Sequence, residues 1–236
     1  MTDHNLRLFV AVELPDDVRR ALQDTIDALR AAGATSGLRY VRPEGIHITL
    51  KFLGATPEGR VQTIATGLRL GVRGAAPFEL QPQEIGTFHG RRHEPYAFGY
   101  LREAYPSNVR VVWVGLRGDT PPPSPEYPAF GTPHALTDLA ERVESALNPL
   151  GFPRELDGHG NPRPFFAHLT MARLRDDSSR EDRERLFHLL REFEAPPFPS
   201  FRVERVSLMQ STLQRGGAVY GALATFPLEG RAEDDQ

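Results

Sequence analysis

The chain has 236 residues, a formal net charge of -3 and no cysteine, which excludes thiol catalysis, disulfides and cysteine-ligated metals. This charge argues against a protein that coats nucleic acid without regard to sequence, because such domains are usually strongly basic, but it allows a small basic cleft for one terminal phosphate. No apolar run approaches membrane-spanning length and no secretory leader precedes the first apolar run, so we expect a cytoplasmic protein with no membrane partner.

The first half of the chain alternates predicted strands and helices. An apolar run at 6–14 predicts a strand, and Pro15 is typical of the first turn of a helix, which we expect to extend to about residue 32. Further elements are an amphipathic helix and two strands, at 57–70, 46–52 and 78–85.

The second half repeats this alternation. β-branched residues predict a strand at 109–116, and a helix follows at 136–150, with Thr137 as a candidate cap and Gly151 as a stop. A further strand, a charged helix and two more strands are predicted at 165–172, 180–193, 201–213 and 219–226. The repeated alternation indicates two similar lobes in one domain, with a frayed tail at 228–236.

The tripeptide His-x-Thr occurs once in each half, each time inside an apolar run. These motifs are His47 to Thr49 and His168 to Thr170. Because side chains alternate along a strand, each histidine points to the same side of the sheet as its threonine. Two such strands side by side would present two imidazoles and two hydroxyls to one cleft. Imidazole titrates near neutrality, so one ring can act as a base and the other as an acid on a phosphodiester, with no metal.

A cation follows each motif at a similar distance. Lys51, the only lysine of the chain, lies two residues after Thr49, and Arg173 lies three residues after Thr170. Either cation is a candidate phosphate contact, and the alternatives are a solvated strand end for Lys51 and a carboxylate partner for Arg173.

With both motifs in place, the chain resembles the 2H phosphoesterases, and among them the LigT-like RNA 2',3'-cyclic phosphodiesterases, also described as RNA 2'-5' ligases. The resemblance runs from end to end of the chain. The segments that carry it are 6–15, 41–54, 164–173, 208–213 and 216–220. It implies an α+β, bilobal and pseudo-symmetric fold, with two antiparallel-rich sheets flanking a central cleft and helices on the outside.

The resemblance also implies an activity. We expect hydrolysis of a terminal RNA 2',3'-cyclic phosphate to a 2'-phosphate, with no metal and no cofactor, and 2'-5' ligation as the reverse reaction. By resemblance His168 activates water and His47 protonates the leaving 3'-oxygen, while Thr49 and Thr170 donate hydroxyls to phosphate oxygens. The near symmetry of the two motifs leaves the opposite assignment of the histidines open. Phe52 and Tyr220 are candidate nucleotide contacts.

Two other functions stay open at this stage. The same residues can bind an RNA end without catalysing a reaction. Alternatively, the chain can be a related enzyme that acts on ADP-ribose 1'',2''-cyclic phosphate or on RNA tails. Intact copies of both motifs favour an enzyme, since a binding protein is free to lose one. Two segments, at 89–108 and 118–133, look longer than the corresponding connections in the family and bear on the rim of the cleft. The simplest expectation for the assembly is a monomer.

Overall fold

The computed structural model describes residues 4–35, 37–89, 94–97, 109–118, 133–156, 159–163, 165–215 and 217–230. Most of the two long segments expected at 89–108 and 118–133 lies outside these ranges. The strand expected at 78–85 is longer than predicted. This strand, β4 (Phe78–His89), extends to the start of the segment 89–108 and pairs with a further strand inside that segment, β5 (Glu94–Ala97).

The other elements of the first half follow the predicted order. The structure adds a short strand and two single turns of 3-10 helix that the sequence did not indicate. The elements are β1 (Asn5–Glu13), α1 (Asp16–Ala31), β2 (Leu38–Tyr40), η1 (Pro43–Gly45), β3 (His47–Pro57), η2 (Glu58–Arg60) and α2 (Val61–Val72).

The second half is also close to prediction. Its elements are β6 (Val109–Arg117), α3 (His134–Leu147), η4 (Asn148–Leu150), β7 (Leu169–Leu174), α4 (Arg180–Glu192), β8 (Phe201–Val203), β9 (Arg205–Gln214) and β10 (Gly217–Pro227). The prediction of Thr137 as a cap was wrong, because α3 begins earlier and the Thr137 hydroxyl donates to the carbonyl of Pro133, four residues back. Gly151 does follow the helical segment, with a φ of 84° that favours glycine.

The strands form one curled, largely antiparallel sheet. Its order is β10-β9-β1-β3-β7-β6-β4-β5, with β2 pairing with β7 and β8 pairing with β4. The two expected sheets are therefore joined, and the junction is the pairing of β3 with β7, where Ile48 lies opposite Leu169. The expected α+β fold is confirmed, with the two halves meeting at this junction.

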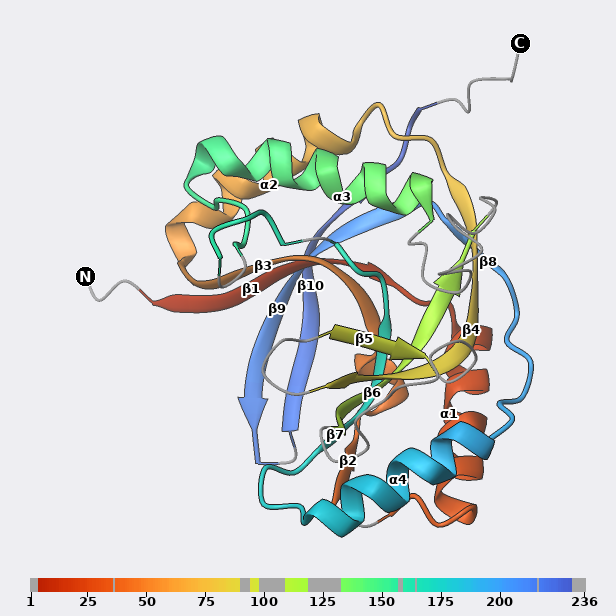
Figure 1. Cartoon of the computed structure of the whole chain (residues 1–236). Helices are drawn as coiled ribbons and strands as arrows, with labels where there is room; N and C mark the ends of the chain where they lie inside the picture. The colour runs from red at the N-terminus through yellow and green to blue at the C-terminus, as the bar shows by residue number, and fades with distance from the viewer. Residues whose placement is uncertain are drawn as a thin grey trace.

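The helices lie on the outside of the sheet in two groups. Figure 1 shows α2 and α3 together at one end of the molecule and α1 and α4 at the other. The helix α1 buries Val18, Leu22, Ile26 and Leu29, a spacing that places them along one face. A single buried cluster contains residues from all four helices. We propose on this ground that the two lobes form one domain.

The polypeptide near the C-terminus is held against the body at first. Leu228 is buried, and its amide donates to the carbonyl of Glu204, while the amide of Gly230 donates to the carbonyl of Ala75. Residues 228–230 are thus not frayed as expected, because their backbone and one apolar side chain have partners. The rest of the expected tail lies outside the described residues.

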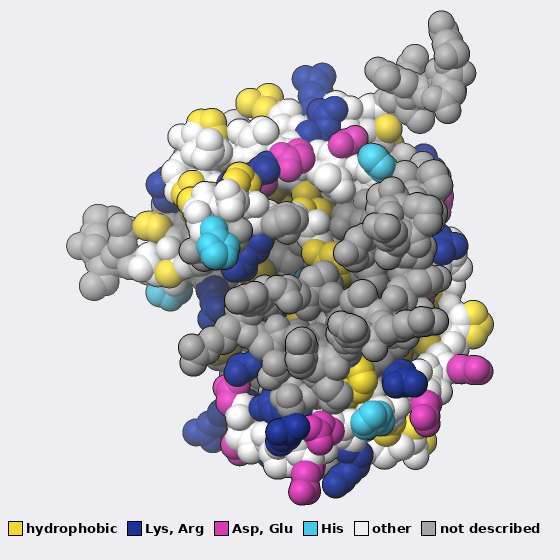
Figure 2. All heavy atoms as spheres, in the orientation of Figure 1, with side chains coloured by type: hydrophobic (Ala, Val, Ile, Leu, Met, Phe, Trp, Pro, Cys, Tyr) yellow, Lys and Arg dark blue, Asp and Glu magenta, His cyan; other side chains and the backbone are white. Residues whose placement is uncertain are grey.

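The surface carries mixed charge. On the face drawn in Figure 2, Lys and Arg side chains are interspersed with Asp and Glu among the described residues. This agrees with the small net charge of -3. None of the helices in the described ranges combines the length and the apolar character that crossing a membrane requires.

Candidate active site

The junction of β3 and β7 brings the two motifs together. Ile48 and Leu169, the middle residues of the motifs, are opposite each other in antiparallel register and are both 0% exposed in the helix-covered core. The residues on either side of them must then lie on the opposite face of the sheet. In an antiparallel ladder the next positions put His47 across from Thr170, and Thr49 across from His168. We call this side of the sheet the histidine face.

Both imidazoles are oriented by the same local contact. His47 Nδ1 is 2.8 Å from the carbonyl oxygen of Gly45, and His168 Nδ1 is 3.0 Å from that of Phe166, in each case two residues back. A carbonyl oxygen can only accept, so each Nδ1 carries the hydrogen. The Nε2 atom of each neutral ring is therefore left with a lone pair, as a base requires, and can hold a proton, as an acid requires.

Aromatic side chains fix the His47 ring on the β1 side of the junction. Phe9 lies with its ring centroid 4.7 Å from that of His47, and Tyr220 approaches edge-on at 5.1 Å. The Tyr220 ring lies close to the backbone of Gly45, because a Cβ at Gly45 would lie only 3.2 Å from Tyr220 Cε2. The expected cleft residue Tyr220 thus contacts the first histidine directly.

A second set of rings fixes His168. Phe88 meets it edge-on with a centroid distance of 4.7 Å, and Phe166 is stacked at 6.0 Å. Phe88 and Phe166 also contact Trp113, which lies opposite Thr170 on β6. The two histidines therefore have similar backbone contacts but different aromatic neighbours.

The two histidines differ in electrostatics. The pKa of His168 is lowered to about 4, mainly by burial; the carbonyl of Phe166 opposes this shift, and the charges of Arg173 and His47 add to it. Burial also lowers the pKa of His47, but there the carbonyl of Gly45 and the carboxylate of Glu13 oppose the effect. Each histidine thus takes up a proton less readily than in water, and His168 is the one for which a large shift is found.

Arg173 lies within electrostatic range of both motifs. It is exposed on β7 and its charge lowers the pKa of both His47 and His168. Its cross-strand partners are Val111 on β6 and Arg39 on β2. Arg39 is also exposed, and the sequence reasoning missed it because β2 is only three residues long. Two like charges in direct cross-strand positions are unfavourable unless an anion lies between them.

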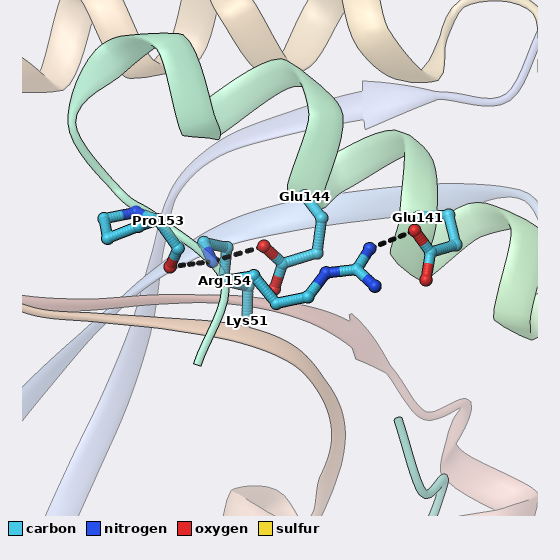
Figure 3. Close-up of polar contacts among 5 residues, drawn as sticks. All are labelled: Lys51, Glu141, Glu144, Pro153 and Arg154. Carbon is cyan, nitrogen blue, oxygen red and sulfur yellow. Dashed lines mark hydrogen bonds and ion pairs between the residues drawn. The ribbon is translucent and has the colours of Figure 1, made fainter. Parts of the chain in front are cut away.

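Lys51 does not lie on the histidine face. Its Nζ is 2.6 Å from Glu144 Oε2 of α3 and 3.0 Å from the carbonyl oxygen of Pro153, and its side chain is 3% exposed (Figure 3). The expectation that it binds phosphate is therefore wrong for this structure. The neighbouring Arg154 and Glu141 form a second, more exposed ion pair.

A bulge explains the position of Lys51. On β3 Thr49 pairs with Ala11 and Lys51 with Val10, so Leu50 is an extra residue and the alternation of faces reverses after it. The same happens on β7, where Met171 is extra between Thr170 and Ala172. The counterpart of Lys51 is thus the buried Ala172.

The bulges make Phe52 the counterpart of Arg173. Phe52 pairs with Phe9 on the histidine face, with the ring centroids 6.3 Å apart, and is 62% exposed. One half of the junction therefore presents an exposed aromatic ring, and the other half presents an exposed cation, at equivalent positions.

Glu13 is another residue of the junction that sequence reasoning missed, as are Phe9 and Phe88. Glu13 is the last residue of β1, and it lies opposite His47. The local sequence gives no sign of this placement, because it depends on the register between two strands. That register follows from the pairing of Val12 with Ile48.

Comparisons with known proteins agree with this architecture. The family model described as LigT like Phosphoesterase matches residues 12–96 and 131–220. A protein of Methanothermobacter thermautotrophicus named RNA 2',3'-cyclic phosphodiesterase is 28% identical, over 94% of this chain and 99% of its own. One of the same name from Thermotoga maritima is 25% identical, over 95% of this chain and 97% of its own.

Solved structures show the same fold. A crystal structure of Escherichia coli LigT with 3'-AMP superposes with a TM-score of 0.62 at 22% identity and covers 95% of this chain and 98% of its own. A Thermus thermophilus structure gives a TM-score of 0.63 at 24% identity, covering 96% of this chain and all of its own.

Proposed function

Because the chain belongs to the LigT-like phosphoesterase family, we propose that it hydrolyses the 2',3'-cyclic phosphate at an RNA end. The observation that carries the proposal is the antiparallel pairing of Ile48 with Leu169, which sets a histidine and a threonine from each motif on one face. Relatives that match nearly the whole chain and bear this activity as their name support the same substrate class.

The proposed reaction needs a base on one side of phosphorus and an acid on the other. We assign His168 as the base that takes a proton from water, and His47 as the acid that protonates the 3'-oxygen as its bond to phosphorus breaks. The product is a 2'-phosphate and a 3'-hydroxyl. His168, with its pKa lowered to about 4, is the ring that stays neutral, and the carboxylate of Glu13 favours a protonated His47. The large fall in the pKa of His168, and the opposing charge of Glu13 at His47, support this assignment over the reverse one.

The threonines and an arginine are proposed to hold the phosphate. Thr49 and Thr170 lie across from His168 and His47, so their hydroxyls are placed to donate to the non-bridging oxygens. Arg173 adds charge beside both rings, and Arg39 adds a second guanidinium across the strand pair. Lys51 is left out of this set because it is bound to Glu144.

Nucleotide contacts are proposed at the aromatic half of the junction. Phe52 is exposed and lies beside Phe9, and Tyr220 lies against His47. An exposed ring next to a phosphate site can stack on a base without selecting its identity. This arrangement agrees with a substrate whose sugar carries the cyclic phosphate and whose base lies toward Phe52. In the reverse direction the same pair of histidines would join a hydroxyl to the cyclic phosphate.

The test is incubation of the protein with an oligoribonucleotide that ends in a 2',3'-cyclic phosphate, followed by identification of the product end. The expected product is a 2'-phosphate. A 3'-phosphate would show that the bond between phosphorus and the 2'-oxygen breaks instead, so that the acid protonates the 2'-oxygen. Tight binding without turnover would overturn the enzyme proposal in favour of an RNA-end binder. A strong preference for ADP-ribose 1'',2''-cyclic phosphate would replace the RNA substrate.

A further inference from the structure

Glu13 is held beside His47 by a chain of hydroxyl groups. The Ser207 hydroxyl lies 2.5 Å from Glu13 Oε1, and it is 3.2 Å from the Thr225 hydroxyl. Ser207 has a single hydrogen, which it gives to the carboxylate, so Thr225 is the donor to Ser207. Ser207 is 0% exposed and lies on β9, while Thr225 lies opposite it on β10. Three strands thus fix the orientation of this carboxylate.

Among the described residues, the position that corresponds to Glu13 in the second half of the junction carries no carboxylate. In the pairing of β6 with β7, Val114 lies opposite Leu169, just as Val12 lies opposite Ile48 in the first half. The residue after Val114 is Gly115, so glycine holds the position that corresponds to Glu13. A side chain has little room there, because a Cβ on Gly115 would lie 3.1 Å from the carbonyl oxygen of Gln83. The pseudo-symmetry of the site is broken at this position.

We propose that Glu13 is a positioning residue that keeps the proton on His47 and thereby determines which of the two similar histidines is the acid. The assignment of the acid role rests on the proposed function above. The placement of Glu13 opposite His47 does not, since it follows from the register of β1 with β3.

The groups around His47 act in opposite directions. Arg173, from β7, lowers the pKa of both histidines, whereas Glu13, from β1, raises that of His47. His168 faces His47 across the junction and Tyr220 contacts it from β10. Burial and the charge of Arg173 both lower the pKa of His47, and the Glu13 charge opposes them. If that charge is removed, His47 should therefore lose its proton at a lower pH.

The test is the substitution Glu13→Gln, which removes the charge and keeps an oxygen that can accept from Ser207. The titration of His47 is followed by NMR in the whole protein, without substrate. We expect the pKa of His47 to fall by about one unit in the variant, which is the order of effect expected when a nearby opposite charge is lost. The alkaline limb of the activity profile should move to lower pH by the same amount. At pH values above this limb the variant should have about tenfold lower kcat/KM than the wild type, because the protonated fraction of His47 falls tenfold for each unit by which its pKa falls.

Three further variants separate this role from a structural one. Glu13→Asp keeps the charge and should restore most of the wild-type titration. Ser207→Ala frees the carboxylate and should lower the pKa of His47 by less than Glu13→Gln does. Glu58→Gln removes the same charge beyond the far end of β3 and should leave both the titration and the profile unchanged. Circular dichroism confirms that each variant is folded.

Two results would overturn the proposal. One is an unchanged His47 titration in Glu13→Gln, whatever happens to the rate. The other is an equal fall in the pKa of His47 in Glu58→Gln, which would indicate a general charge effect. If the wild-type protein does not hydrolyse cyclic phosphates, the proposed function fails, but the titration of His47 still reports on the effect of the Glu13 charge.

Discussion

Ile48 and Leu169 are opposite each other at the junction between the two halves of the sheet. Each is 0% exposed, and each separates a histidine from a threonine. Because the pairing is antiparallel, a histidine of one half is opposite a threonine of the other. The pair therefore sets the spacing of all four motif side chains, and its own side chains anchor them in the core.

Removing either imidazole should nearly abolish hydrolysis. We expect His47→Ala and His168→Ala each to lower kcat by roughly 10²- to 10⁴-fold, which is the usual contribution of a positioned acid or base. The double variant should be little worse than either single one, since the two groups act in one step. Steady-state rates on a cyclic-phosphate RNA measure this, with thermal unfolding as the control for folding. Near-normal turnover in either single variant would exclude the two-histidine mechanism.

The threonines should matter less than the histidines. Thr49→Ala and Thr170→Ala each remove one hydroxyl donor, so we expect losses of about 10- to 1000-fold in kcat, by analogy with a removed oxyanion donor. Thr→Ser should restore most of the rate, because the hydroxyl is kept. If Ser is as damaging as Ala, the threonine methyl group rather than the donor is what the site requires.

The sequence predicts most of the strands, and it predicts that each histidine lies on the same face as the threonine of its own motif, because both depend on local alternation. It does not predict the bulges at Leu50 and Met171, which depend on how neighbouring strands twist, and so it misplaced Lys51. Glu13 was missed for a related reason, since its place opposite His47 comes from the register of two strands distant in sequence.

The rate should be bell-shaped in pH, with its maximum on the acidic side of neutrality. In the free enzyme the acid limb reflects His168, whose pKa is lowered to about 4, and the alkaline limb reflects His47, whose pKa burial lowers from its usual value. A bound phosphate favours both protonated rings, so the kcat profile should lie at higher pH than the kcat/KM profile. A single-limbed profile would contradict the use of two titrating groups.

Activity should persist in excess EDTA. Imidazoles, hydroxyls and guanidinium groups are together sufficient for proton transfer and for stabilising charge on the phosphate oxygens. The measurement is the initial rate after prolonged treatment with EDTA and removal of the chelated ions. Complete loss of activity that Mg²⁺ or Mn²⁺ restores would contradict the mechanism.

The ion pair of Lys51 and Glu144 should contribute to stability rather than to phosphate binding. Lys51→Met leaves the Glu144 carboxylate, whose side chain is 19% exposed, without its cation, and we expect a loss of about 2 to 4 kcal/mol in the free energy of unfolding. The double variant with Glu144→Leu should recover most of the lost free energy of unfolding.

Arg154→Met, at the exposed pair with Glu141, is the matched control and should cost under about 1 kcal/mol. Denaturant unfolding measures all three, and a KM that rises sharply in Lys51→Met at unchanged stability would restore the phosphate role.

Acid should destabilise the fold through His168. Its pKa is about 4 in the folded state and near 6.5 in the unfolded chain, so between these values only the unfolded state takes up the proton. The free energy of unfolding should therefore fall as the pH falls from 6.5 to 4, by roughly 3 kcal/mol from this group alone, and level off below pH 4.

The glutamine in His168→Gln cannot titrate, so this variant should lose correspondingly less stability over the same pH range. His188→Gln, which removes an exposed histidine of α4, is the control and should give a curve parallel to that of the wild type. Denaturant unfolding at a series of pH values decides the matter, and parallel curves for His168→Gln and wild type would show that this imidazole is not held neutral by the fold.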